Sequence, residues 1–167
     1  MIGEFHKVRQ YRFVKRSFLL ATNYNSSPSS GKTVKIDKIR SDDENPGLRD
    51  FEASFLRLLE KVTNGSVIEI SYTGTSVLYK PGVITGGKIS HDCGTARAIG
   101  YYLEPMIAIA PFAKSPFNLT LSGITNDNVD VSVDLIRTVT LLQLRRFGVG
   151  DGIELKESID YMHYMSE

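Results

Sequence analysis

Hydrophobic and polar positions follow two different periods between Asn45 and Tyr72, and the rest of the chain is organised around this stretch. In its first part, apolar residues recur every three or four positions, as on one face of an α-helix. They are Phe51, Phe55, Leu58, Leu59 and Val62. Pro46-Gly47 cannot continue a helix from upstream, so the pattern predicts a helix that starts near Leu48. Asn64-Gly65 supplies a left-handed residue that ends it.

After this helix, apolar and polar positions alternate one by one. Ile68, Ile70 and Tyr72 alternate with Glu69 and Ser71, which predicts a half-buried strand. A turn at 73–75 then leads into a second strand over 76–80, which Pro81-Gly82 ends. A further strand is expected upstream, over 33–39, and a short amphipathic helix over 13–22. A flexible polar loop, NYNSSPSSG, joins these two over 23–31.

The second half of the chain partly repeats this order. Residues 83–92 read as a strand broken by Gly86-Gly87, and 118–124 as another strand. Thr95 is a candidate cap for a helix that Pro105 should kink. Its apolar stripe is Ala96, Ile99, Leu103, Met106, Ile107 and Ala110. Asp130 is the candidate cap of a last helix, ended by Gly148, whose inward stripe is Val133, Ile136, Thr140, Leu144 and Phe147.

The order of elements predicts an α+β fold with two tandem pseudo-repeats. In each repeat, two helices would pack on one face of a mixed four-stranded sheet. We expect the first repeat, with a basic N-terminal entry and the loop at 23–31, over residues 1–82. The second repeat would cover 83–156, and residues 157–167 would form a separate C-terminal tail.

Composition places the chain among ordinary globular proteins but does not indicate a particular function. The 167 residues are 41% hydrophobic and 23% charged, with a net charge of +1, as in ordinary soluble domains. Residues 1–50 hold 10 of the 20 Lys and Arg residues but only 6 of the 19 acidic residues, which favours one basic contact face. The single cysteine, Cys93, excludes an intrachain disulfide and a multi-cysteine metal site. No 18-residue apolar run predicts a membrane-spanning helix.

Three long segments resemble the RNA 3'-terminal phosphate cyclase family, and within it the cyclase-like branch of eukaryotic nucleoli. They are KIRSDDENPGLRDFEASFLRLLEKVTNGSVIEISYTGT, KPGVITGGKISHDCGTARAIGYYLEP and PFNLTLSGITNDNVDVSVDLIRTVTLLQLRRFGV. The family is built from repeats of two helices on a four-stranded sheet. In the family, the chain continues after the equivalent of Lys156 into a glycine-rich signature. Here it reads ESIDYMHYMSE, so we expect a truncated isoform or a fragment of a longer parent.

The resemblance implies a non-catalytic protein of ribosome biogenesis without a cofactor. It would act in the nucleus, in the nucleolus, on small-subunit rRNA precursor, as part of the small-subunit processome. A ribosome-assembly GTPase would be its direct partner. One alternative is an ATP-dependent RNA 3'-terminal phosphate cyclase, and another is a truncated product without function. Departures from the cyclases count against the enzyme: a glycine-rich entry is missing before Phe13, and Arg97 and Glu104 replace a small residue and a glutamine.

Several residues are candidates for contact with RNA or phosphate, each with a plain structural alternative. Thr95 and Arg97 precede a helix whose free N–H groups could bind an anion, or they simply begin that helix. Arg40 and Arg49 could contact phosphate, or they could form ion pairs with the acidic run 42–44. Arg12 and Lys15 belong to a basic, aromatic segment that could touch RNA, or that could simply be a solvated basic entry to the predicted helix.

His91 and Cys93 form the one tempting catalytic pair, but they are neighbours on a predicted strand with no third orienting group. We therefore predict no catalytic residue and no metal site.

The end of the chain carries one more expectation. In the family, a further repeat covers apolar surface beside the last helix, and the tail is too short to replace it. We therefore expect the chain to self-associate through its exposed second repeat or to need a partner, and deletion of residues 158–167 to change stability little.

Overall fold

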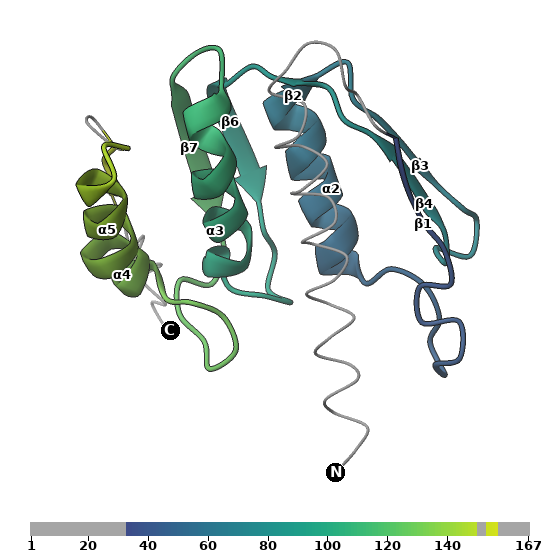
Figure 1. The fold of residues 1–167 in the computed structure, drawn as a ribbon. Coiled ribbons are helices and arrows are strands. Elements are labelled where there is room, and N and C mark those ends of the chain that lie inside the picture. Colours follow the sequence, from purple (N-terminus) through teal and green to yellow (C-terminus); the bar gives the residue numbers. More distant parts are fainter. Residues whose placement is uncertain (1–32, 150–152, 157–167) are drawn as a thin grey trace, which may run out of the picture.

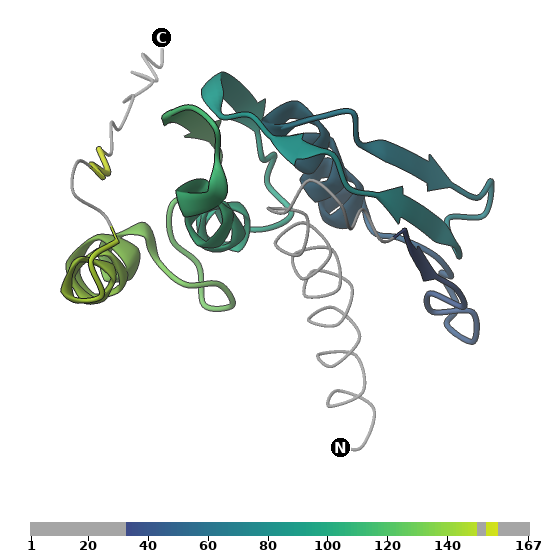
Figure 2. The ribbon, with the colours of Figure 1, turned by 45° about the horizontal axis from the view of Figure 1, so that its top comes forward.

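The structure is a computed structural model that describes residues 33–149 and 153–156. The predicted helix at 13–22, the loop at 23–31 and the tail at 157–167 lie outside the described residues. So do the candidate residues Arg12 and Lys15. In the described part, the elements stand side by side: a sheet, helix α2, a second sheet with helix α3, and a last helix (Figures 1 and 2). The α+β class is confirmed. No helix among the described residues is long and apolar enough to cross a membrane.

The first sheet has the order β1-β4-β3, with β1 at Val34–Ile36, β3 at Val67–Ile70 and β4 at Val77–Lys80. Both pairings are antiparallel. In the register, Val77 of β4 lies between Ile36 and Ile70, so one apolar row crosses all three strands. Val77 is fully buried, because it occupies the central strand.

The prediction that Ile68, Ile70 and Tyr72 form the buried side of strand β3 is only partly right. Ile68 is half-buried, but 46% of Ile70 is exposed, and Tyr72 lies beyond the strand and is fully exposed. The alternation of apolar residues marked a strand correctly, but it could not show how well each end of the strand is covered. Ile36 on the opposite edge strand pairs with the same Val77 and is buried.

Helix α2 spans Asp50–Val62, two residues inside the predicted start, as is usual for helix ends. Its predicted stripe is buried: Phe55, Leu58, Leu59 and Val62 are at most 1% exposed, and Phe51 is half-buried. The helix stops earlier than Asn64-Gly65, because Thr63–Asn64 forms strand β2 and pairs with β5 at Val83–Ile84. The hydroxyl of Thr63 donates to the Leu59 carbonyl (2.7 Å), which satisfies one of the terminal acceptors.

The second sheet pairs β6 (Gly87–Asp92) with β7 (Phe117–Ser122) in parallel, which confirms the predicted break at Gly86-Gly87. Helix α3 (Ile99–Ile109) and a short 3-10 turn, η1 (Ala110–Phe112), connect them. The N-cap of α3 is Ala98, so Thr95 does not cap it, and Ala96 is exposed rather than inward. The helix runs through Pro105; its predicted kink stays a prediction.

The last helix has three parts: α4 (Val133–Leu135), a π-helical segment η2 (Ile136–Thr140) and α5 (Leu141–Arg146). Ser132 caps it by accepting from the Leu135 N–H (3.2 Å), so the predicted cap at Asp130 is wrong. A π-helical turn holds one residue more than an α-helical turn. The side chains after the segment therefore point to other sides of the helix than a continuous α-helix would give them. As a result Leu141 is buried, whereas the predicted core residue Phe147 is 81% exposed.

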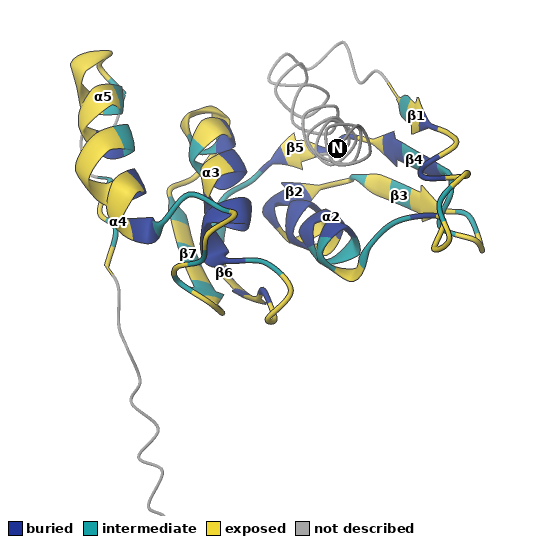
Figure 3. Ribbon diagram, turned by 90° about the horizontal axis from the view of Figure 1, so that it is seen from below, coloured by how far each residue is buried: buried dark blue, intermediate teal, exposed yellow. Residues whose placement is uncertain are grey.

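One hydrophobic core extends through both halves of the described chain (Figure 3). Its fully buried members include Leu58 and Tyr79 from the first half and Tyr102 and Ile109 from the second. The described residues form sheets of three, two and two strands. The tandem arrangement of four-stranded sheets and the domain boundaries at 82 and 156 therefore stay predictions.

Candidate functional site

Three of the predicted phosphate-binding residues meet at the first turn of helix α2. Arg40 contacts Glu52 in that turn, Arg49 is the N-cap of the helix, and the guanidinium of Arg97 lies 5.2 Å from the ring centre of Phe51. We call Arg40, Arg49 and Arg97 the arginine cluster. Each of its members also contacts a carboxylate, but only Arg49 does so within the acidic run 42–44, since Arg40 pairs with Glu52 and Arg97 with Asp130.

Arg40 is the innermost member of the cluster. Its Nη2 lies 2.6 Å from Oε1 of Glu52, and each of these two side chains is only 1% exposed. Its Nη1 donates to the Gly47 carbonyl (2.7 Å), in the turn that leads into the helix. Arg40 itself has a positive φ of 48°, a strained conformation for a residue with a side chain. A phosphate could reach this guanidinium only if the buried ion pair opened.

Glu52 explains how the helix begins without a Ser, Thr, Asp or Asn cap. While Oε1 accepts from Arg40, Oε2 accepts from the backbone N–H of Arg49 (2.9 Å), as in a capping box. One buried carboxylate therefore fixes both the arginine and the first turn of the helix.

Arg49 lies nearer the surface. Its Nη2 is 3.2 Å from Oδ2 of Asp43, and the two side chains are 27% and 22% exposed. The pair with the acidic run is the one expected from the sequence. Its partial exposure leaves a cation at the N-terminal end of a helix, where the helix dipole also favours anions.

Arg97 is held by three contacts. Its Nε donates to Oδ2 of Asp130 (2.7 Å) and its Nη2 donates to Oδ1, in a bidentate pair. Its guanidinium also lies 4.8 Å from the ring centre of Tyr101 and over Phe51, within cation–π range. The hydrogen bonds from Arg97 to Asp130 raise the pKa of Arg97 above its ordinary value. The side chain is still 19% exposed.

The loop before the last helix positions Asp130. Oδ1 of Asp127 accepts from the backbone N–H groups of Val129 (2.9 Å) and Asp130 (2.6 Å), and these bonds lower the pKa of Asp127. The loop then passes so close to α3 that a Cβ on Gly100 would lie 1.8 Å from the Val131 carbonyl. Only glycine fits there, and the loop can therefore bring Asp130 to Arg97.

Thr95 lies in the exposed loop between β6 and α3, and no described hydrogen bond joins it to the cluster. Arg12 and Lys15 lie outside the described residues. Sequence reasoning missed Glu52 and Asp130 as the partners of the cluster, because these pairs are 12 and 33 residues apart along the chain.

The pair of His91 and Cys93 is placed for packing. Nε2 of His91 lies 2.9 Å from Oγ of Ser54 on α2, and its ring packs against Tyr102. Burial lowers the pKa of His91 and raises that of Cys93 to about 12, so the thiolate is disfavoured. The neighbouring Asp92 accepts from the Gly94 N–H instead (2.9 Å). Among the described residues, no carboxylate hydrogen-bonds His91 to complete a triad.

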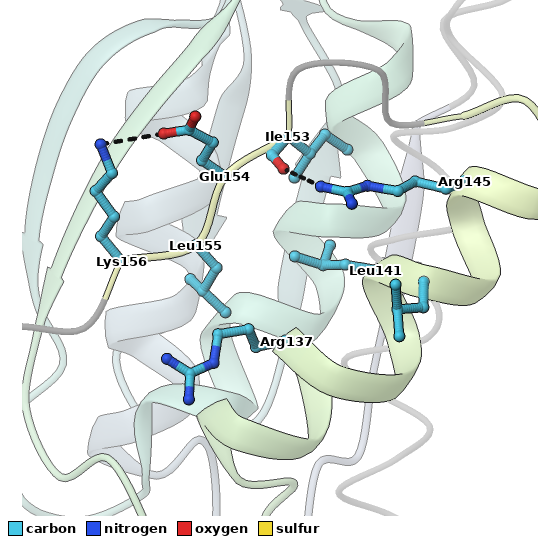
Figure 4. A pocket seen from close by; sticks show the side chains of 8 residues that line it. Arg137, Leu141, Arg145, Ile153, Glu154, Leu155 and Lys156 are labelled. Carbon is cyan, nitrogen blue, oxygen red and sulfur yellow. Dashed lines mark hydrogen bonds and ion pairs between the residues drawn. The ribbon is translucent and has the colours of Figure 1, made fainter.

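A shallow hollow of about 430 Å³ lies beside α5 (Figure 4). The segment 153–156 forms one wall, and Arg145 donates from Nη2 to the Ile153 carbonyl (3.3 Å). Lys156 is paired with Glu154 (3.1 Å), and both are well exposed. In the described ranges, no group of three or more acidic, histidine or cysteine side chains could hold a metal ion.

Comparison with known proteins decides the family. The sequence profile of the RNA 3'-terminal phosphate cyclase family matches residues 18–161. The chain belongs to this family. It is 56% identical over 131 residues to the probable RNA 3'-terminal phosphate cyclase-like protein of Dictyostelium discoideum, a match that covers 78% of this chain and 35% of the relative.

Two further relatives extend the comparison. The human RNA 3'-terminal phosphate cyclase-like protein is 52% identical over 145 residues, which cover 86% of this chain and 37% of the relative. The rRNA processing protein RCL1 of Saccharomyces cerevisiae is 52% identical over 120 residues, or 72% of this chain and 33% of the relative. The chain thus spans about a third of the length of these relatives.

Proposed function

We propose that this chain is a non-catalytic member of the cyclase family that acts in ribosome biogenesis, in the processing of small-subunit rRNA precursor. The main support for this proposal is that the chain is 52% identical to the yeast rRNA processing protein RCL1. It is also 52% identical to the human protein named RNA 3'-terminal phosphate cyclase-like. The proposal includes the nucleolus as its location, and the small-subunit processome and a ribosome-assembly GTPase as partners.

The non-catalytic part of the proposal is supported by the chemistry of the described residues. His91 and Ser54 are in contact but lack a described acid to orient the imidazole, and the buried Cys93 has its pKa raised. Carboxylates neutralise all three members of the arginine cluster. Such pairs suit a binding surface or a structural element better than a site of acid–base catalysis.

The proposed contact with pre-rRNA uses the exposed side of the arginine cluster. Arg49 and Arg97 keep 27% and 19% of their side chains exposed at the start of α2. Phosphate oxygens could share these guanidinium groups with Asp43 and Asp130, because a guanidinium has five donors. Thr95 is proposed to extend this surface, and Arg40 to support it from below. Arg12 and Lys15, which lie outside the described residues, are proposed as further RNA contacts. The two proposed repeats, 1–82 and 83–156, would meet here.

Filter binding with a labelled fragment of small-subunit rRNA precursor tests the RNA contact. Arg49→Ala and Arg97→Ala should each weaken binding and reduce its salt dependence, since each removes one phosphate contact. Arg57→Ala is the matched control, because Arg57 is an exposed arginine on the same helix, two turns beyond the cluster. Equal effects of all three variants, or none, would contradict the proposed surface.

A segment exchange tests the function itself. The 120 residues of this chain that match the yeast relative would replace the corresponding stretch of that protein in cells that depend on it. We expect small-subunit rRNA precursor to be processed at a normal rate. Accumulation of the precursor, with the chimaeric protein present at normal abundance, would show that this chain lacks the shared function.

A further inference from the structure

Tyr72 is a fully exposed aromatic residue at the tip of the hairpin that joins β3 to β4. It follows Ile70, the last residue of β3, by two positions and lies in the turn before β4. Aromatic rings carry a large apolar surface, whose burial against a partner is favourable. Tyr72 keeps that surface in water, so the ring adds little to the core and is available to a ligand.

The backbone on both sides of Tyr72 is fixed by hydrogen bonds. The N–H of Ser71 donates to the Ser76 carbonyl (2.9 Å), and the N–H of Ser76 donates to the Ser71 hydroxyl (2.9 Å). The N–H of Gly74 donates to the Ser71 carbonyl (2.8 Å), which closes the turn around Tyr72. A ring on a fixed turn has only its own side-chain rotations to lose when a ligand packs on it, and such preorganisation favours binding.

The hairpin is attached to the loop that leads into helix α2, and Figure 1 shows the two next to each other. The N–H of Leu48 donates to the Gly74 carbonyl (3.0 Å). A Cβ on Gly47, whose φ is 91°, would lie 2.5 Å from the Thr73 carbonyl oxygen, so glycine is required for this close approach. Leu48 directly precedes Arg49. Only a few residues along this junction therefore separate the exposed ring from the exposed guanidinium of the arginine cluster.

The charges next to the hairpin are balanced. Arg49 is paired with Asp43 (3.2 Å), and Lys35 is paired with Asp37 (3.1 Å). The rest of the run 42–44 adds exposed acidic groups. Phosphate contacts alone would therefore bind RNA weakly here, because that attraction depends on excess positive charge. Stacking of a base on an aromatic ring does not need such an excess.

We propose that Tyr72 stacks on an unpaired base of the RNA that Arg49 contacts, so that this surface takes single-stranded RNA in preference to a duplex. In a duplex, each base is already stacked between its neighbours, and an exposed ring can reach only a base that is splayed out of the helix. The inference rests on the proposed contact with pre-rRNA, and it names the form of RNA that the same surface binds.

Fluorescence anisotropy of the full chain tests this with a labelled, unpaired fragment of small-subunit rRNA precursor, beside the same fragment annealed to its complement. Tyr72→Ala should weaken binding of the unpaired fragment about tenfold, because the stacking contact is lost. Tyr72→Phe keeps the ring and should bind like the unchanged chain. Phe147→Ala is the matched control, since Phe147 is 81% exposed but follows α5, outside the hairpin.

Salt dependence and the form of the RNA separate stacking from the phosphate contacts. Tyr72→Ala removes no phosphate contact, so its salt dependence and its affinity for the duplex should match those of the unchanged chain. If Tyr72→Ala bound the unpaired fragment as tightly as the unchanged chain while Arg49→Ala bound it more weakly, this inference alone would be overturned. Equal weakening of both RNA forms by Tyr72→Ala would overturn it as well. A chain that binds neither form would overturn the proposed RNA contact, and this inference with it.

Discussion

Nη2 of Arg40 and Oε1 of Glu52 lie 2.6 Å apart in a part of the protein where both side chains are 1% exposed. The same carboxylate accepts the Arg49 N–H at the start of helix α2. A single buried ion pair therefore joins the turn before the helix to its first turn. Loss of one partner would leave the other charge buried without an opposite charge beside it.

We expect Glu52→Gln and Arg40→Met each to lower the free energy of unfolding by roughly 3–5 kcal/mol. Urea melts followed by circular dichroism would measure the loss. Arg49→Ala is the control: its pair is partly exposed and is worth at most about 1 kcal/mol. If Arg40→Met proved as mild as Arg49→Ala, the pair would not be buried in solution.

The stripe of helix α2 makes a second prediction. Phe55 and Leu58 are 1% and 0% exposed, so replacement of either by Ala should cost about 2–5 kcal/mol through lost burial and an unfilled cavity. Arg57→Ala, on the exposed side, should cost under about 0.5 kcal/mol. Similar losses for all three variants in denaturant melts would mean that the helix is rotated about its axis.

Acid should destabilise the protein through His91. Burial, together with the charges of Lys61 and Arg57, lowers its pKa below the ordinary value of 6.5, and Asp92 opposes this only in part. Below about pH 6.5 the unfolded chain therefore binds a proton that the folded chain resists, so stability falls as the pH is lowered further. Above that pH, His91 is neutral in both states and contributes no pH dependence.

Thermal melts between about pH 7.5 and pH 5 would measure this effect, with a His91→Gln variant as reference. The glutamine side chain cannot titrate, so the fall in melting temperature below about pH 6.5 should be smaller in the variant. An identical pH profile for the two proteins would show that His91 is not buried in a neutral form.

Cys93 should be chemically inert in the folded chain. It is 4% exposed, and burial raises its pKa to about 12, so the reactive thiolate is both rare and inaccessible. We expect iodoacetamide at about pH 8 to label the thiol readily in urea and far more slowly in buffer, with mass spectrometry as the readout. Fast labelling in buffer would place Cys93 at the surface.

Incubation with labelled ATP should leave no covalent adduct on the protein. This expectation rests on the proposed non-catalytic function, and on the finding that no described carboxylate hydrogen-bonds His91. Denaturing electrophoresis would detect an adduct. A labelled band that disappears in His91→Ala or His163→Ala would overturn the non-catalytic proposal.

Local patterns in the sequence predicted local structure well. The stripe of α2 and the break at Gly86-Gly87 are both confirmed, because each depends on residues a few positions apart. Errors arose where distant parts of the chain decide the outcome. Ile70 on edge strand β3 is 46% exposed, whereas Ile36, which pairs with the same Val77 from the other edge strand β1, is buried. What covers each edge is a property of the whole fold rather than of the strand's own sequence.

In the candidate site, too, contacts between residues close in sequence could be predicted and contacts between distant residues could not. Sequence reasoning singled out Arg40, Arg49 and Arg97 and offered ion pairs with the acidic run as one alternative for Arg40 and Arg49. Arg49 does pair with Asp43 of that run, whereas Arg40 pairs with Glu52. Sequence reasoning could not pair Arg97 with Asp130, which a separate loop brings to it from 33 residues away. It also missed Ser54, whose contact with His91 crosses from helix α2 to strand β6 over 37 residues.

The π segment at Ile136–Thr140 has a consequence for the evolution of the last helix. Such a segment is what remains when one residue is inserted into an α-helix. If one residue between Arg137 and Thr140 were deleted, the buried Ile136, Leu141 and half-buried Leu144 would fall at i, i+4 and i+7, the spacing of an unbroken α-helix. A relative one residue shorter here could therefore keep the same core, and the extra residue is free to change only the surface that the helix presents outward.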